Sequence, residues 1–189
     1  MIAYNAEQKL ESLLNDLKKQ DYDHKKIEII LVDGHSEDHT KRVMERFATS
    51  NHDFLRVSVF DNPKRILPTG WNIAINESQG DIILRVDAHS SIPEDFIRRN
   101  VECIESGEKI CGGPRNSIID QDNGWQRTLL LAERSVFGSG MAEYRRKKVK
   151  KYVTTLAHAA YSREVFQAVG EYDERLVRTE DNEIHYRMR

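Results

Sequence analysis

Apolar residues follow two spacings along the chain, one typical of helices and one of buried strands. Residues 7–19 place four leucines at helical spacing, and a β-rich apolar run at 27–32 follows them. The same pattern predicts helices at 36–47 and 69–78 and strands at 55–60 and 82–86. Repeated units of strand and helix imply a parallel sheet. We therefore expect an α/β, Rossmann-like fold with a mostly parallel sheet flanked by helices.

The pattern after residue 86 is less regular. Ser91-Ile92-Pro93-Glu94 has the form of a capping box with proline in the first turn, so we expect a helix from this point to about Glu105. Residues 112–114 should break the chain, residues 125–137 should be helical, and the glycines at 138–140 indicate a mobile loop. A last helix is expected to start near Thr179.

Composition limits the class of protein. With 189 residues, 39% of them hydrophobic, the chain can bury one core and is expected to form a single domain. Its net charge of -2 gives no reason to expect nucleic acid as a partner. Cys103 and Cys111 form no CxxC pair, so we read both as buried thiols in a reducing, cytoplasmic compartment. No run reaches the ~20 apolar residues of a membrane span.

Both ends of the chain look incomplete. A doubly wound sheet normally begins with a full strand, yet only residues 1–3 precede the turn at Tyr4-Asn5. Arg189 falls within the predicted last helix. We expect a fragment that is truncated at both ends.

The segment around Asp87 and His89 is the strongest candidate for chemistry. An apolar strand ends on Asp87, and His89 follows two residues later. At the mouth of a strand, this carboxylate and imidazole would suit a Mn²⁺-type ion that bridges a diphosphate. By spacing alone, however, two such residues are more often ordinary loop residues.

Three further sites each have a structural alternative. Asp33 ends a strand and could bind a base or ribose, or it could be a turn carboxylate before a Ser36 helix cap. Lys64 and Arg65 follow a strand and could meet phosphate, although a solvated loop is the default. Thr179-Glu180-Asp181 begins a helix, where acidic residues are expected for the dipole alone.

The order of these segments along the chain favours the functional interpretation over the structural alternatives. Tyr4-Asn5-Ala6-Glu7, followed by a strand and the segment 32–40, resembles the start of family-two glycosyltransferases, whose usual form is YNxE and then VDDGSTDGT. Asp87-Ala88-His89 stands at the DxD position of that family, and Thr179-Glu180-Asp181 repeats its TED motif. Residues 161–174 resemble its RREVFxxVGGFDE segment. The DAH variant and the LVRTEDNE ending look most like the bacterial exopolysaccharide branch, of the succinoglycan-synthesis kind.

The resemblance implies a GT-A fold in one catalytic domain, with residues 1–110 as the nucleotide-binding half and residues 111–189 as a smaller acceptor-side half. It also implies inverting transfer of a sugar from a nucleotide-diphosphate donor, with a UDP-sugar favoured. The acceptor would be a hydroxyl of a saccharide or of a lipid-linked molecule, in polysaccharide or glycolipid synthesis.

The resemblance also suggests roles for the residues. Asp181 would be the base that deprotonates the acceptor, and Glu180 would position it. Asp87 and His89 would hold Mn²⁺ or Mg²⁺, which would stabilise the leaving diphosphate. Tyr4 and Asp33 would contact the nucleoside of the donor. Lys64 and Arg65 would contact its diphosphate.

Two departures from the family pattern matter. Gly34 stands where the family usually has a second Asp, which weakens the preference for UDP over another nucleotide. His89 replaces the last Asp of DxD, so the affinity for the metal would fall as pH drops through about 6.5.

Two other classes stay open on the sequence. A non-catalytic nucleotide-sugar binding module would fit the incomplete ends and the altered DxD motif. A nucleotidyltransferase would share the carboxylate at the strand edge, but its usual glycine-rich N-terminal loop is not visible. The basic run at 145–151 could bring the protein to the inner face of an anionic membrane, or it could be a solvated loop.

Overall fold

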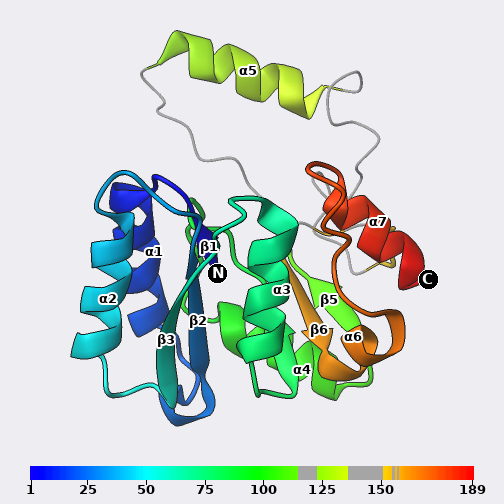
Figure 1. Cartoon of the computed structure of the whole chain (residues 1–189). Coiled ribbons are helices and arrows are strands. Elements are labelled where there is room, and N and C mark those ends of the chain that lie inside the picture. Colours follow the sequence, from blue (N-terminus) through cyan, green and yellow to red (C-terminus); the bar gives the residue numbers. More distant parts are fainter. Residues whose placement is uncertain (115–122, 136–150, 155, 157) are drawn as a thin grey trace.

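The computed structural model describes residues 1–114, 123–135, 151–154, 156 and 158–189. Two small sheets lie side by side within it (Figure 1). Helices cover both faces of the first sheet, as predicted for an α/β fold. The strands are β1 (Ile2–Ala3), β2 (Glu28–Asp33), β3 (Arg56–Asp61), β4 (Ile82–Leu84), β5 (Ile110–Gly112) and β6 (Ala159–Ser162). The helices are α1 (Glu7–Lys18), η1 (His24–Lys26), α2 (Thr40–Ser50), α3 (Leu67–Glu77), α4 (Phe96–Glu105), α5 (Gly124–Arg134), α6 (Arg163–Val169) and α7 (Glu180–Arg187).

The first sheet is parallel and has the order β1-β2-β3. Strand β2 is buried on both faces, and its successive side chains point to opposite layers, as in any strand. Ile29 and Leu31 pack into the core formed with α1 and α2, whereas Ile30 and Val32 pack against Ala74 of α3. The predicted helix at 7–19 is confirmed, and its four leucines are its buried residues.

The second sheet is antiparallel and has the order β4-β6-β5. Its central strand β6 comes from late in the sequence and pairs with β4 and β5, which come earlier. The parallel pairing expected from repeated strand–helix units therefore holds for the first three strands and is wrong for residues 82–86. The strand at this point is also shorter than predicted, since β4 ends at Leu84.

Two helices begin later than the sequence predicted, because other segments bind their expected caps. Helix α2 starts at Thr40, four residues after Ser36. The Ser36 hydroxyl accepts a hydrogen bond from the Asn5 backbone N–H instead, and Asp38 bonds the backbone of Thr40.

Helix α4 starts at Phe96, and the predicted capping box of residues 91–94 does not cap it. The Ser91 hydroxyl donates to the Asp16 carboxylate of α1 at 2.8 Å. The Glu94 carbonyl accepts from the backbone N–H of Asp21 at 2.9 Å. These contacts tie the segment to the end of α1, and the helix ends at Glu105, as predicted.

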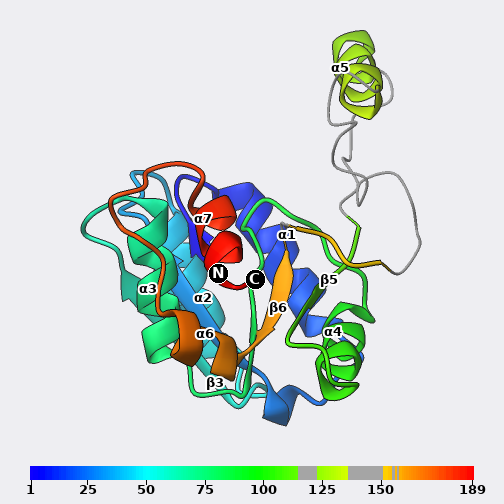
Figure 2. The same cartoon turned by 90° about the vertical axis from the view of Figure 1, so that its right-hand side faces the viewer.

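The C-terminal part packs mainly around a second core, which joins α3 to β6, α6 and α7 through Trp71, Tyr161, Phe166 and Ile184. Helix α5 lies apart from both sheets in both views (Figures 1 and 2), and its Trp125 side chain is exposed. The predicted loop at 138–140 and residues 145–150 of the basic run lie outside the described residues. No helix in the described part is long and apolar enough to cross a membrane.

Two other expectations have different outcomes. Cys111 is buried, but Cys103 is only partly buried, so the prediction of two buried thiols is wrong for Cys103. The division into halves at residue 110 stays a prediction. Strand β6 of the second half pairs with β4 of the first, so residues from both halves share one sheet.

Candidate active site

Asp33 ends strand β2 and is 2% exposed. Both of its carboxylate oxygens accept from the backbone N–H of Ser36, at 3.1 and 3.3 Å. His35, inside this turn, has a φ of 67°, in the left-handed region. The contacts of Asp33 are therefore those of a turn carboxylate, one of the two interpretations of the sequence. The binding of a nucleoside by Asp33 stays a prediction.

The loop after β1 lies against this turn. Asn5 bonds it from two sides, through its backbone N–H to the Ser36 hydroxyl and through its side chain to the Glu37 N–H. Tyr4 is 54% exposed and so can meet a ligand. A Cβ atom on Gly34 would lie 3.2 Å from both the Ala3 carbonyl oxygen and the Tyr4 Cβ. This close approach favours glycine where the family usually has aspartate.

The two predicted phosphate-binding cations lie in the loop between β3 and α3. Lys64 is exposed and forms an ion pair with Glu174. Arg65 is also exposed, and its φ is 58°. Both side chains reach solvent, but the described contacts of Lys64 go to Glu174, which precedes the TED segment.

Asp87 lies in the loop after β4, with 22% of its side chain exposed. Its nearest imidazole partner is His158, just before β6, whose Nε2 atom is 3.9 Å from Asp87 Oδ2. The same nitrogen is 3.2 Å from the Ser90 hydroxyl. His89 is exposed, and its predicted place as a metal ligand beside Asp87 stays untested. The sequence reasoning missed His158.

Glu180 and Asp181 open helix α7, directly after Thr179, which has a φ of 64°. Glu180 is 7% exposed, whereas 32% of the Asp181 side chain is exposed. Burial, followed by the charge of Asp181, raises the pKa of Glu180 above its ordinary value. Of the two acids, Asp181 is the more accessible to solvent.

Arg85 joins the two acidic motifs. Its Nη1 donates to Asp181 Oδ1, its Nη2 lies 4.0 Å from Glu180, and its Nε lies 3.6 Å from Asp87. The sequence separates residues 85 and 181 by 96 positions. The sequence reasoning passed over Arg85, although one charged residue at the end of a buried apolar run was a usable signal.

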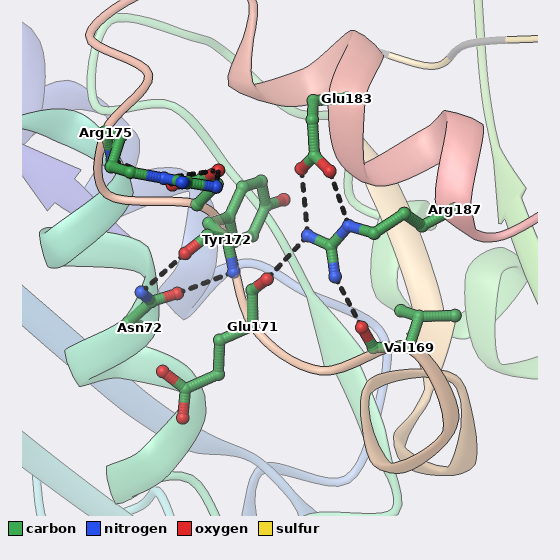
Figure 3. Close-up of polar contacts among 8 residues, drawn as sticks. Asn72, Val169, Glu171, Tyr172, Arg175, Glu183 and Arg187 are labelled. Carbon is green, nitrogen blue, oxygen red and sulfur yellow. Dashed lines mark hydrogen bonds and ion pairs between the residues drawn. The ribbon is translucent and has the colours of Figure 1, made fainter.

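A hydrogen-bonded scaffold holds the segment that leads to α7 (Figure 3). The Asn72 side chain of α3 bonds both the N–H and the carbonyl of Tyr172, each at 2.9 Å. Arg187 of α7 binds Glu183 and the carbonyls of Val169 and Glu171. Residues 169–172 are therefore fixed to α3 on one side and to α7 on the other.

A cavity of about 90 Å³ lies between the two sheets, next to this cluster. Trp71, Arg85 and Tyr172 line it together with apolar residues of β4 and β6. Asp33, Asp87 and Asp181 do not line it. The candidate active site is instead the surface around Asp87 and Asp181, whose carboxylates are both partly exposed.

Among known proteins, the chain is similar to succinoglycan biosynthesis protein ExoA of Rhizobium meliloti, with 31% identity over 166 residues that cover 85% of this chain and 48% of ExoA. It is 27% identical to the poly(ribitol-phosphate) beta-N-acetylglucosaminyltransferase TarS of Staphylococcus aureus, over 81% of this chain and 23% of TarS. The chain thus spans less than half the length of these two curated relatives.

Solved structures confirm the predicted GT-A class of fold. A mannosyltransferase of Pyrobaculum calidifontis, in complex with GDP-Man and Mn²⁺, matches with a TM-score of 0.69 and 20% identity, over 99% of this chain and 50% of that chain. S. aureus TarS in complex with UDP-GlcNAc also matches with a TM-score of 0.69, at 17% identity over 99% of this chain and 51% of that chain.

The family model named Glycosyl transferase family 2 matches residues 1–170. This match includes the YNAE, VDGHS and DAH segments, and the likeness to ExoA agrees with the predicted succinoglycan-type branch. The chain belongs to glycosyl transferase family 2.

Proposed function

We propose that this chain forms the catalytic part of an enzyme that transfers a sugar from a nucleotide-diphosphate sugar to a hydroxyl group, with inversion at the sugar carbon. One observation carries the proposal. The fold brings Asp87 of the DAH motif and Asp181 of the TED motif to the same guanidinium, that of Arg85. A donor-side and an acceptor-side carboxylate are thus close enough to act on one bond.

Names of relatives support the substrate classes. TarS has been solved with UDP-GlcNAc and the P. calidifontis enzyme with GDP-Man, so the fold accepts sugars on different nucleotides. We favour a UDP-sugar here, bound by Tyr4 and Asp33. The likeness to ExoA favours a saccharide or lipid-linked acceptor in exopolysaccharide synthesis.

The donor atoms around Asp87 fit a divalent ion. Ligand atoms lie about 2.1 Å from such ions, so two of them can bind one ion when they are up to about 4 Å apart. The 3.9 Å between Asp87 Oδ2 and His158 Nε2 meets this condition. A carboxylate with an imidazole suits Mn²⁺ better than Mg²⁺, which prefers oxygen ligands. We propose Asp87 with His158 or His89 as the protein ligands, although the described residues contain no cluster of three or more such groups.

Glu180 and Asp181 have different roles on the acceptor side. Inversion needs one in-line displacement, and the acceptor hydroxyl loses its proton as it attacks the sugar. Asp181 Oδ1 is bound by Arg85, and the partly exposed carboxylate leaves its second oxygen able to accept that proton. Glu180, buried behind it, acts through packing and charge. A metal bound at Asp87 would stabilise the charge on the leaving diphosphate.

A binding experiment tests the donor site. UDP, GDP and a few nucleotide sugars are titrated calorimetrically, with and without Mn²⁺. We expect micromolar, metal-dependent binding of UDP that Asp87→Ala abolishes. Asp95→Ala is a matched control, since Asp95 is an acidic residue at the start of α4 whose described contact is with Arg99. Absence of binding for every nucleotide would refute the proposed donor site.

A turnover experiment tests the base. Release of nucleotide from the donor is followed in the presence of saccharide and lipid-linked acceptors. Asp181→Asn should abolish transfer and leave UDP affinity within about threefold, because its role is proton transfer. Full turnover by this variant would show that the base is another residue. Tight binding without turnover at any acceptor would instead support the non-catalytic binding module.

A further inference from the structure

Arg85 is a charged residue in a buried position. It is 6% exposed and follows directly after strand β4. Its backbone N–H donates to the Ala159 carbonyl of β6 at 3.0 Å, so the central strand of the second sheet fixes the start of its side chain. Its guanidinium lies 4.3 Å from the centre of the Trp71 ring. The guanidinium is therefore held on a rigid support, as a positioning group requires.

Three carboxylates surround this one cation. The hydrogen bond to Asp181 and the two longer ion pairs, 4.0 Å to Glu180 and 3.6 Å to Asp87, use different nitrogens of the guanidinium. The Nε atom is buried and has no hydrogen-bond partner among the described contacts, and Asp87 lies just beyond hydrogen-bond distance from it. A planar fork with separate donors can face several carboxylates at once, which a lysine ammonium on a flexible stem does less well.

The guanidinium of Arg85 is positively charged. A guanidinium keeps its proton in proteins, and the carboxylates of Asp181 and Asp87 lie beside this one. One positive charge thus faces up to three negative charges at neutral pH. Without it, the carboxylates would repel one another in a partly buried site.

We propose that Arg85 is a positioning residue for sugar transfer, which sets the base Asp181 at a fixed distance from the metal-binding Asp87. The inference rests on the proposed function and adds to it the residue that links the donor side to the acceptor side. Arg85 holds one oxygen of Asp181 and leaves the other for the acceptor. It also acts as a counter-ion to Asp87, so it competes with a divalent cation for that carboxylate.

This competition gives a test with a distinctive sign. In Arg85→Met, the loss of a positive charge near Asp87 should tighten Mn²⁺ binding by about 10–30-fold, which Coulomb's law gives for a divalent ion and a unit charge some 4–6 Å apart even at the dielectric constant of water. Turnover should fall at least about 100-fold, mostly in kcat, because the base is no longer held. A merely structural defect would weaken metal binding and turnover together.

The experiment measures Mn²⁺ affinity by electron paramagnetic resonance with UDP in excess, and kcat and KM by nucleotide release. Circular dichroism checks folding. Arg46→Met is the matched control, since Arg46 is an exposed arginine paired with Glu11 and should leave both quantities unchanged. If Arg85→Met does not fold, Arg85→Lys decides the question. It keeps the charge, so Mn²⁺ affinity should stay within about twofold while kcat falls at least about tenfold.

The outcomes separate this inference from the proposed function. An active wild type with an Arg85→Met variant that binds Mn²⁺ more weakly, or with an Arg85→Lys variant of normal kcat, overturns the role of Arg85 alone. A wild type that neither binds nucleotide nor turns over overturns the proposed function, and this inference with it. Tighter Mn²⁺ binding with reduced kcat supports both.

Discussion

Replacing Asn72 by alanine should destabilise the protein, chiefly through the loss of its two hydrogen bonds to Tyr172 and also through the loss of a longer one to Glu174. Asn72 is 5% exposed and lies in helix α3. Its side chain donates to the Tyr172 carbonyl and accepts from the Tyr172 N–H, each at 2.9 Å. Both of these backbone groups are in a buried environment. Alanine would leave them without these partners.

The magnitude follows from the cost of unpaired buried groups. Each such donor or acceptor costs about 1–3 kcal/mol. Some water will enter the space that the amide leaves, so we expect a loss of about 2–4 kcal/mol in the free energy of unfolding for the two groups together. With a urea m-value of about 2 kcal/mol/M, the unfolding midpoint should fall by about 1–2 M.

Urea unfolding followed by circular dichroism measures this loss, and Asn76→Ala supplies the control. Asn76 is in the same helix but is exposed. Both variants gain the few tenths of a kcal/mol of helix propensity that alanine offers over asparagine. The difference between them therefore reports the hydrogen bonds of the Asn72 side chain, most of all the two to Tyr172. A difference below about 0.5 kcal/mol would refute the view that Asn72 anchors the segment before α7.

Three further changes test other parts of the structure. Burial, and after it the charge of Asp181, raises the pKa of Glu180, so the stability that protonated Glu180 contributes is full below its unfolded pKa of about 4.3 and is lost as pH rises through the folded pKa. Glu180→Gln should therefore flatten the fall in the free energy of unfolding that urea unfolding measures at pH 4–7. An unchanged pH profile would contradict this. Thr179→Gly should raise the free energy of unfolding by about 0.5–1 kcal/mol, since a β-branched residue at a φ of 64° is strained, and a lower midpoint would count against that strain. Lys64→Ala breaks an exposed ion pair, so thermal unfolding should show a change in stability below about 1 kcal/mol. Calorimetry should show UDP binding weakened several-fold, because we propose that Lys64 contacts the diphosphate. Unchanged UDP affinity would remove Lys64 from the donor site.

Local patterns predicted the first sheet well. The leucines of α1 and the apolar run of β2 are buried as their spacing indicated, because burial of a face depends on residues close in the sequence. The start of α4 was not predictable in this way. Its expected cap, Ser91, bonds Asp16, and such a partner 75 residues away leaves no local signal.

The candidate site shows the same limit. The motifs located Asp87, Glu180 and Asp181, since each stands next to a strand end or a helix start. Arg85 had a local signal that was passed over, but its contact with Asp181 and the approach of His158 to Asp87 arise only from packing between distant segments. The antiparallel pairing of β4 depends on β6, which the sequence places beyond α4 and α5. A single sequence read by periodicity cannot supply such pairings.

The place of β6 has a consequence for how the protein is made. Since β6 is the central strand between β4 and β5, a ribosome-bound chain that has not yet emerged to residue 162 lacks the strand that joins them. The first sheet can form early, because its three strands end by residue 61. Until β6 has been synthesised, the edges of β4 and β5 that pair with it remain exposed. Exposed strand edges favour aggregation. We expect this interval of translation, which also precedes the folding of α7, to be the stage at which the nascent chain depends most on chaperones.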